Sequence, residues 1–258
     1  MSTLRADGLC LSLLLLAGAC MPSAKRPVQP GPLDGRIDSY WNDVDLDTAE
    51  TGWREQRIVD FLYLMEHADS ATRHTGWQRL HAALDSSLDR TVVDYLGESG
   101  SPLYAPGLLD EYLVSLVGAL PATDAGHIRA AYLLRNIRKN RPGDIVANLP
   151  LLAVADSSVP TALHSVLHTL PGNTADVLIL FYDPDCDTCD SLISDLAQSV
   201  AATPVIAVSV AGTDKSLPAG WRSFRAAGSE VLDSLFYLPS LPALYYVDPA
   251  SLRVTRRG

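Results

Sequence analysis

The sequence predicts a two-part α+β chain, in which an all-α N-terminal domain is followed by an α/β domain built from a βαβ unit and a β-hairpin. Between residues 40 and 140, apolar residues recur at every third or fourth position, which is the period of a helix buried on one face. After residue 141 the pattern changes to short, continuous apolar runs bounded by turn residues, which are typical of buried strands. The length of 258 residues is sufficient for two ordinary domains.

The composition indicates a globular protein with a substantial core and an acidic surface. Apolar residues make up 47% of the chain and charged residues 19%, while the formal net charge is −10. Because a negative surface repels phosphate groups, this charge argues against nucleic acid as a partner.

The first nineteen residues are predicted to form a leader that is not part of the fold. Arg5 gives a short positive start, residues 9–16 are rich in leucine, and three small residues precede Cys20. The apolar run is shorter than the ~20 residues that a membrane-spanning helix needs, and it fits the core of a signal peptide. Small residues directly before a cysteine resemble the lipobox of bacterial lipoproteins, in which that cysteine is lipidated and becomes the mature N-terminus.

This resemblance implies a signal peptide over residues 1–19 and a lipid on Cys20, which would anchor the protein to a bacterial membrane, facing the periplasm. Ordinary secretion with cleavage nearby is the alternative, and it also places the protein outside the cytoplasm. Of the four cysteines, Cys10 would leave with the leader and Cys20 would carry lipid. Cys186 and Cys189 then remain as one pair in a compartment where disulfides form.

Residues 20–38 are predicted to be a tether, because residues 21–35 contain four prolines and no apolar periodicity. Residues 39–141 are predicted to form four or five short helices, since four apolar stripes with helical spacing are separated by turn-forming segments. Pro106 is expected in the first turn of the third of these helices. The stripes consist of Trp53, Ile58, Phe61, Leu62 and Met65; Trp77, Leu80, Leu84 and Leu88; Leu109, Tyr112, Leu113, Leu116 and Leu120; and Ile128, Ala131, Leu134 and Ile137.

Residues 142–258 are predicted to form the α/β domain. The helical spacing of residues 191–200 places a helix between its first two strands, and strand, helix and strand in that order imply a parallel βαβ unit. Residues 252–255 are expected to close a hairpin with the third strand. The three buried strands are expected over residues 176–182, 204–210 and 243–247.

Two cysteines lie where the first buried strand gives way to the following helix, in the segment Phe181-Tyr-Asp-Pro-Asp-Cys-Asp-Thr-Cys-Asp190. Cys186 is expected at the helix N-terminus, where unpaired N–H groups and the helix dipole stabilise a thiolate. Cys189 follows one turn later on the same face, close enough for a disulfide. We therefore predict that Cys186 is the exposed, attacking thiol and that Cys189 is the resolving thiol.

This arrangement, followed by Ser240-Leu-Pro-Ala-Leu-Tyr245 leading into a strand, resembles the thioredoxin fold. In that fold a cis-proline precedes a core strand and packs beside the dithiol, so the resemblance implies this position for Pro242. Residues 143–149 are similar to the entry segment of the TlpA/ResA-type membrane-anchored thioredoxins. The N-terminal part resembles an uncharacterised helical domain that precedes a thioredoxin-like domain in lipoproteins of Bacteroidetes, at Tyr40-Trp41, Phe61-Leu-Tyr-Leu64 and Ser101-Pro-Leu-Tyr104.

The dithiol segment departs from the usual thioredoxin pattern at three places. Asp185 replaces the tryptophan before the first cysteine, Asp187-Thr188 replaces Gly-Pro, and Leu180 occupies the position of a buried acid that assists proton transfer. Like charges oppose thiolate formation. The four aspartates around the dithiol therefore predict that Cys186 is less acidic than a typical oxidoreductase cysteine and that the couple is rather reducing.

Metal binding and a non-catalytic role are the alternatives. The alternating aspartates suggest a calcium loop, but an EF-hand needs Gly and Glu where this chain has Thr188 and Ser194. A zinc site could combine both cysteines with His164 and His168. In the third alternative, the protein is a binding or structural lipoprotein with an inert disulfide, and its helical domain holds a partner.

The sequence favours an envelope lipoprotein that exchanges thiols and disulfides with extracytoplasmic proteins. Catalysis is assigned to Cys186 and Cys189, with Pro242 aligning the substrate chain, and lipidation to Cys20. No external cofactor and no metal are expected, because two thiols can carry out the exchange by themselves. The expected partners are protein thiols and disulfides of the cell envelope, together with the membrane that takes the lipid.

Overall fold

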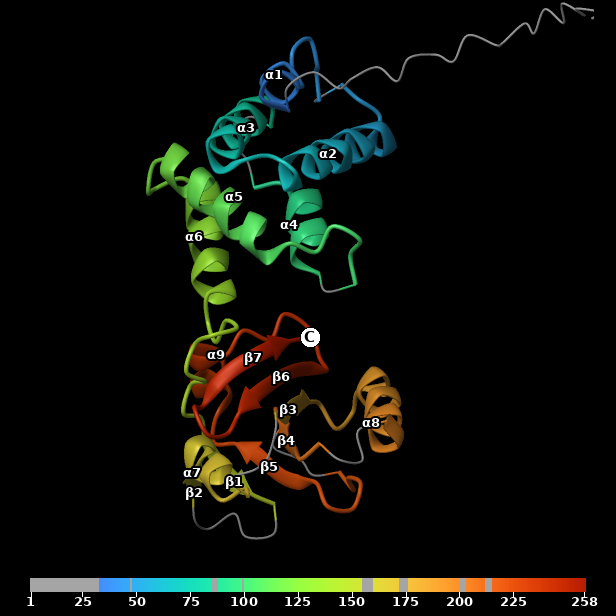
Figure 1. The fold of residues 1–258 in the computed structure, drawn as a ribbon, viewed down its shortest axis with the longest axis vertical. Coiled ribbons are helices and arrows are strands. Elements are labelled where there is room, and N and C mark those ends of the chain that lie inside the picture. The colour runs from blue at the N-terminus through green and yellow to red at the C-terminus, as the bar shows by residue number, and fades with distance from the viewer. Residues whose placement is uncertain are drawn as a thin grey trace, which may run out of the picture.

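In the described part of the chain, helices come first and a mixed sheet with its own helices follows (Figure 1). The predicted leader, Cys20 and the beginning of the predicted tether lie outside the described residues. No helix in the described ranges has both the length and the apolar character that crossing a bilayer requires. The computed structural model describes residues 33–46, 48–84, 88–98, 100–154, 160–171, 176–199, 203–211 and 215–258.

The helical part has one core, in which Phe61, Trp77 and Tyr112 are almost completely buried. The side chain of Asp69 caps the third helix by accepting a backbone N–H of its first turn at 2.8 Å. Pro106 starts the fifth helix, in the first turn where proline is favoured. The described helices before the sheet are α1 (Leu33–Asp38), α2 (Thr51–Glu66), α3 (Ser70–Ala83), α4 (Arg90–Gly97), α5 (Pro106–Ala119) and α6 (Ala125–Ile137).

Three details of the helical part differ from the sequence-based prediction. The predicted tether is too long by six residues, which form α1 because its Ile37 is completely buried in the helical core. Trp53 and Ile128 lie outside the buried faces, with 49% and 56% of their surfaces exposed. Trp53 is five residues from the buried Ile58, which places it about 140° away around the helix. Ile128 likewise lies on the side of α6 away from the buried Ala130.

The C-terminal part contains one sheet. Its described strands are β1 (Pro150–Ala153), β2 (Pro160–Ala162), β3 (Val177–Tyr182), β4 (Val205–Ser209), β5 (Arg222–Ala226), β6 (Ala243–Asp248) and β7 (Arg253–Arg257). They lie in the order β2-β1-β5-β4-β3-β6-β7. β3 and β4 are parallel and are joined through α8 (Asp187–Ser199), which confirms the predicted βαβ unit. β6 and β7 form the predicted antiparallel hairpin.

Strand β3 lies between two layers of helices, and all six of its side chains are buried. Its even-numbered residues face α8, and its odd-numbered residues face α7 (Leu163–His168) and α9 (Ser229–Leu235). A strand that is covered on both sides must be apolar on both sides, which explains the continuous apolar run in its sequence.

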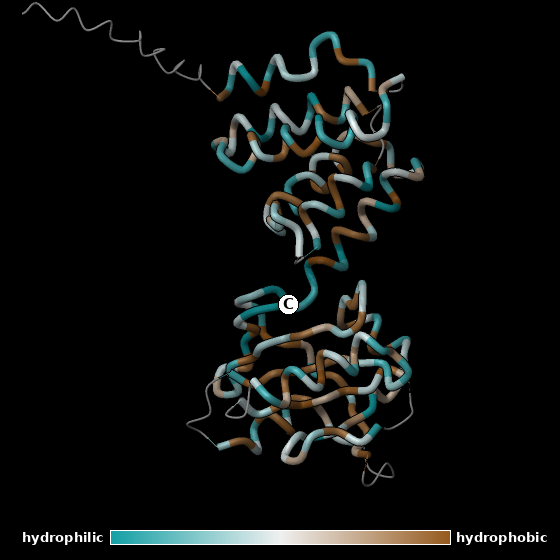
Figure 2. The backbone as a smooth tube through the Cα atoms, turned by 90° about the vertical axis from the view of Figure 1, so that its right-hand side faces the viewer, coloured by the Kyte–Doolittle hydropathy of each residue, from teal (hydrophilic) through white to brown (hydrophobic). Residues whose placement is uncertain are grey.

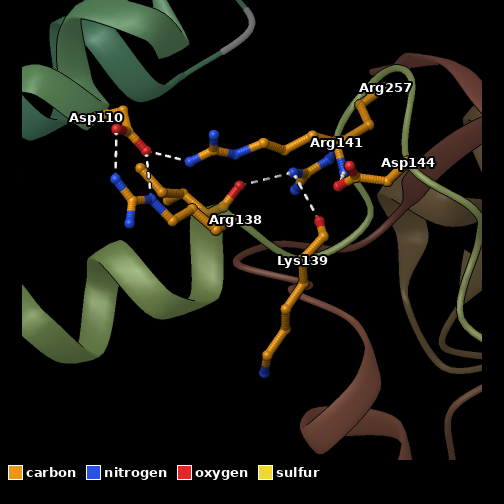
Figure 3. A network of polar contacts seen from close by, with 7 residues as sticks. Asp110, Arg138, Lys139, Arg141, Asp144 and Arg257 are labelled. Atoms are coloured by element: carbon orange, nitrogen blue, oxygen red, sulfur yellow. Dashed lines mark hydrogen bonds and ion pairs between the residues drawn. The ribbon is translucent and has the colours of Figure 1, made fainter.

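A polar network joins the helical part to the sheet part at the end of α6 (Figure 3). Asp110 of α5 forms ion pairs with Arg138 and Arg141, of which the pair with Arg138 measures 2.7 Å. Arg257 of β7 donates to two backbone carbonyls at and just after the end of α6, both at 3.3 Å. The C-terminus therefore lies beside the point where the chain passes from the helices into the sheet (Figure 2).

Candidate dithiol site

The turn between β3 and α8 positions Cys186 and Cys189. The side chain of Asp183 accepts the backbone N–H of Asp185 at 2.9 Å, and its backbone carbonyl accepts the N–H of Cys186 at 3.2 Å. Because α8 begins at Asp187, Cys186 lies just before the first helical turn and Cys189 lies within it. This is the strand-to-helix transition that the sequence predicts for both cysteines.

The two sulfurs lie at different depths. Both cysteines are free thiols; Cys186 is half-buried, whereas Cys189 is completely buried against the face of β3 that α8 covers. The backbone N–H of Cys189 donates to Sγ of Cys186 at 3.2 Å, and the two thiols are hydrogen-bonded to each other. An otherwise unpaired N–H group of the first helical turn is thus directed at the more accessible sulfur.

These contacts separate the acidities of the two thiols. Hydrogen bonds from the Cys189 thiol and from the Cys189 and Thr188 backbone N–H groups lower the pKa of Cys186, against burial and the nearby charge of Asp183. Burial, followed by the hydrogen bond to Cys186, raises the pKa of Cys189 to about 11. The thiolate is the nucleophile in disulfide chemistry, so the structure supports Cys186 as the attacking sulfur.

The surrounding aspartates affect Cys186 less than the sequence suggests. Asp183 is the carboxylate that acts on this thiol, and its effect is smaller than that of the hydrogen bonds, so the net shift of the Cys186 pKa is downward. Asp190 forms an ion pair with Lys215, whose ammonium group also donates to the backbone carbonyl of Pro184 at 3.4 Å. Lys215 therefore offsets part of the negative charge beside the dithiol.

Sequence reasoning missed Lys215, because it lies 26 residues after Cys189 in a segment with no helical or strand pattern. The fold brings it across to the start of α8, where it pairs with Asp190. The pairing raises the pKa of Lys215, so the ammonium form is reinforced. A single lysine in a loop carries no signal of such a role, and only the tertiary structure identifies it.

Pro242 lies directly before β6, and the Leu241–Pro242 peptide bond is cis, as the resemblance to the thioredoxin fold implied. Leu241 packs against the same apolar cluster as Cys186 and Cys189. Ala243, the next residue, is the register partner of Phe181 at the end of β3. The structure thus brings the segment around Pro242 and the two cysteines to the same end of the sheet.

The position of the usual buried acid is occupied by Leu180, whose side chain is completely buried. It faces α8 together with Cys189, in an apolar cluster to which Trp221 also contributes its partly buried ring. The cluster therefore supplies no carboxylate at this position to accept the proton of Cys189. Burial in this apolar cluster is the largest cause of the raised pKa of that thiol.

The four-ligand zinc site considered for this sequence is wrong. α7, which carries His164 and His168, packs on the face of the sheet opposite to Cys189. The Nε2 atom of His164 instead forms a hydrogen bond with the backbone carbonyl of Val146 at 2.6 Å. Among the described residues, no cluster of three or more His, Cys, Asp or Glu side chains has the geometry to hold a metal ion.

A groove lies in the helical part, between α3 and α5. It encloses about 580 Å³, and Trp77, His81 and Glu111 are among its lining residues. The carboxylate of Glu111 is paired within the protein, because Arg73 donates two hydrogen bonds to it, of 2.7 and 2.9 Å. No sequence motif pointed to this groove. Its mixed lining does not select one class of ligand, so the dithiol remains the candidate functional site.

The two thiols are expected to react with alkylating agents at very different rates. In the reduced protein, iodoacetamide should modify Cys186 first, with a pH midpoint below that of a free cysteine, because hydrogen bonds lower its pKa. Cys189 should remain unmodified near neutral pH, since it is buried and its pKa is raised to about 11. Mass spectrometry of peptides from a time course at several pH values measures both rates. Equal labelling of the two cysteines would contradict the geometry described above.

Comparison with known proteins identifies structures that have a similar fold. Neither protein-family models nor curated proteins match the sequence. Among solved structures, a thioredoxin-like protein from Bacteroides caccae superposes with a TM-score of 0.60 at 17% identity, covering 87% of each chain. An exposed lipoprotein thioredoxin from Streptococcus pneumoniae gives a TM-score of 0.32 at 13% identity, over 43% of this chain and 88% of that one. A thio-disulfide isomerase from Thermus thermophilus gives 0.35 at 17% identity, over 46% and 85%.

The likeness to the Bacteroides protein concerns the fold. With its β3–α8–β4 unit, its antiparallel β6–β7 hairpin and helices on both faces of the sheet, the C-terminal part has a thioredoxin-like fold. The match covers 87% of this chain and therefore extends beyond the sheet into the helical part. The predicted fold class, helices followed by a thioredoxin-like α/β part, is confirmed.

Proposed function

We propose that this protein is an envelope lipoprotein that catalyses thiol–disulfide exchange on extracytoplasmic proteins through Cys186 and Cys189. The observation on which the proposal depends is the 3.2 Å hydrogen bond from the Cys189 N–H to Sγ of Cys186, at the start of a helix. This hydrogen bond stabilises the thiolate of Cys186, which is the accessible cysteine, while Cys189 remains protonated and buried beside it. The thioredoxin-like fold supports this proposal.

The exchange proceeds through a mixed disulfide. The thiolate of Cys186 attacks one sulfur of a partner disulfide, so that a bond forms to Cys186 and the partner's other sulfur leaves as a thiolate. Cys189 then transfers its proton to the thiolate released from the partner and attacks Sγ of Cys186. The Cys186–Cys189 disulfide forms, the partner's second sulfur leaves, and the partner has gained two electrons. In the opposite direction the same steps oxidise a partner dithiol, and no cofactor takes part.

Two further assignments complete the proposal. The segment at Pro242 aligns the partner chain by presenting backbone groups as a strand edge, and the packing of Leu241 in the cluster of the two cysteines supports this assignment. A lipid on Cys20 holds the protein to a bacterial membrane on the periplasmic side. The proline-containing segment after Cys20 would set the distance between that membrane and the dithiol.

Equilibration in redox buffers tests the proposal. The purified protein is incubated in dithiothreitol or glutathione buffers of graded potential, and its free thiols are counted by alkylation and mass spectrometry. We expect one reversible two-electron transition that involves both cysteines, and catalysed reduction of insulin disulfides. Cysteines that stay in one state across the whole range, together with no effect on insulin, would refute the proposal.

A non-catalytic lipoprotein with an inert disulfide is the second candidate. The observation that favours it is Leu180, which supplies no buried carboxylate to take the proton of Cys189. In that case the helical part would hold a partner and the cysteines would only stabilise the fold. The same redox titration separates the two candidates, because an inert disulfide does not exchange at ordinary potentials.

A further inference from the structure

Residues 235–242 run from the last residue of α9 to Pro242, directly before β6, and Leu241 of this segment packs in the apolar cluster of Cys186 and Cys189. The first residue of the segment is held by the helical part. Asn140, three residues after the end of α6 and only 6% exposed, donates its side-chain amide to the backbone carbonyl of Leu235 at 2.8 Å. The carbonyl oxygen of the same side chain accepts the backbone N–H of Ala147 at 2.7 Å. One buried amide thus connects the end of the helices, the entry to the sheet and the start of this segment.

Neighbouring contacts hold Asn140 in place. Lys139 donates to the backbone carbonyl of Asp233 in α9 at 2.5 Å and to the side chain of Asn136 in α6 at 2.6 Å. From the other side, Arg257 of β7 contacts the backbone carbonyl of Lys139 at 3.3 Å (Figure 3). The turn that carries Asn140 is therefore fixed to α9 and to the last strand of the sheet.

Further contacts hold the same segment against the sheet, and its end reaches the cluster of the dithiol. The hydroxyl group of Tyr245 donates to the backbone carbonyl of Tyr237 at 2.9 Å. The ring of Phe236 packs against that of Phe181, at the end of β3, with centroids 4.8 Å apart. Leu241 then reaches the apolar cluster that contains Cys189. Asn140 anchors the segment at its first residue and Tyr245 anchors it at Tyr237, and the segment then brings Leu241, the residue before Pro242, into the cluster of the dithiol.

We infer that Asn140 is a positioning residue, through which the helical part sets the place of the Leu241–Pro242 edge relative to Cys186. This inference rests on the proposed function. A protein substrate that lies along this edge depends on the placement of residues 235–242, whereas a small disulfide needs only access to the sulfur of Cys186. The helical part is therefore a component of the protein-substrate site, although it supplies none of the reacting atoms.

The backbone of Asn140 allows a clean test. Its φ angle is +49°, in the left-handed region that glycine adopts freely and asparagine tolerates. Asn140→Gly therefore keeps the turn and removes both side-chain hydrogen bonds. Asn148→Ala is the matched control, because this asparagine lies in the same connection between α6 and the sheet. Its side chain accepts the backbone N–H of His164 at 2.9 Å, so this hydrogen bond leads to α7 and not to residues 235–242.

The experiment compares two substrates, insulin and hydroxyethyl disulfide, with wild-type protein and each variant. For Asn140→Gly we expect kcat/KM for insulin to fall about tenfold, since a misplacement of about 1 Å can cost as much as about a hundredfold in rate. The rate with hydroxyethyl disulfide and the pH midpoint of Cys186 alkylation should stay unchanged, as should every value for Asn148→Ala. A merely structural role of Asn140 would not separate the two substrates.

Each outcome of this comparison supports or overturns the positioning role of Asn140. Equal losses with both substrates, or an unchanged rate with insulin, would overturn the inference. If Asn140→Gly does not fold, Asn140→Asp is measured in the same way, because it keeps the acceptor for the N–H of Ala147 and removes the donor to the carbonyl of Leu235. Wild-type protein that exchanges with neither substrate would instead refute the proposed function.

Discussion

Replacing Cys186 with serine is expected to abolish thiol–disulfide exchange. A serine hydroxyl is not ionised near neutral pH and cannot take the place of the thiolate that hydrogen bonds stabilise at this position. The rate of insulin reduction should fall by a factor on the order of 10³ or more, as it does when a catalytic nucleophile is removed. Insulin turbidity with dithiothreitol as the reductant measures this loss.

Replacing Cys189 with serine should have a different effect. Cys186 keeps its place before the helix and can still attack a partner disulfide, but the buried thiol that resolves the mixed disulfide is gone. Non-reducing mass spectrometry should therefore find the partner covalently attached to Cys186. The two serine variants serve as controls for each other, because only Cys189→Ser should trap the partner. If both variants are inactive and neither traps the partner, the proposed roles of attacking and resolving cysteine are wrong.

Acidification from pH 7 to pH 5 is expected to destabilise the helical part by about 2 kcal/mol through His81 alone. This side chain in α3 is 3% exposed, and burial lowers its pKa to about 4, whereas the unfolded chain keeps the ordinary value near 6.5. The unfolded state therefore binds the proton more tightly. Stability is complete above pH 6.5 and falls as the pH drops toward 4.

Urea unfolding at pH 7 and pH 5 measures this contribution as a difference between variants. His81→Phe keeps an aromatic ring against Tyr112, whose ring centroid lies 5.3 Å from that of His81, and removes the titrating group. Its stability should depend less on pH than that of the wild-type protein. His74→Gln, at an exposed position on the same helix, is the matched control and should behave like wild type. Identical pH dependence in all three proteins would rule out the effect.

Much of the architecture could be predicted from the sequence, because it depends on local patterns. The continuous apolar run over β3 requires cover on both faces, and the cysteines follow it at the beginning of a helical pattern. The proline at position 242 precedes another apolar run, which forms β6. Trp53 and Ile128 show where this reasoning fails, since a stripe of apolar residues does not reveal where the buried face of a helix ends.

The sequence by itself determined the order of helices and strands, the parallel βαβ unit and the place of the dithiol at a helix start, because hydrophobic period and motif spacing are local properties of a chain. The tertiary structure alone decided which distant groups meet there. Lys215 reaches Asp190, Asn140 reaches Leu235, and the two histidines lie across the sheet from Cys189. Such contacts depend on how packed layers bring remote segments together, and single polar residues in loops leave no periodic signal of them.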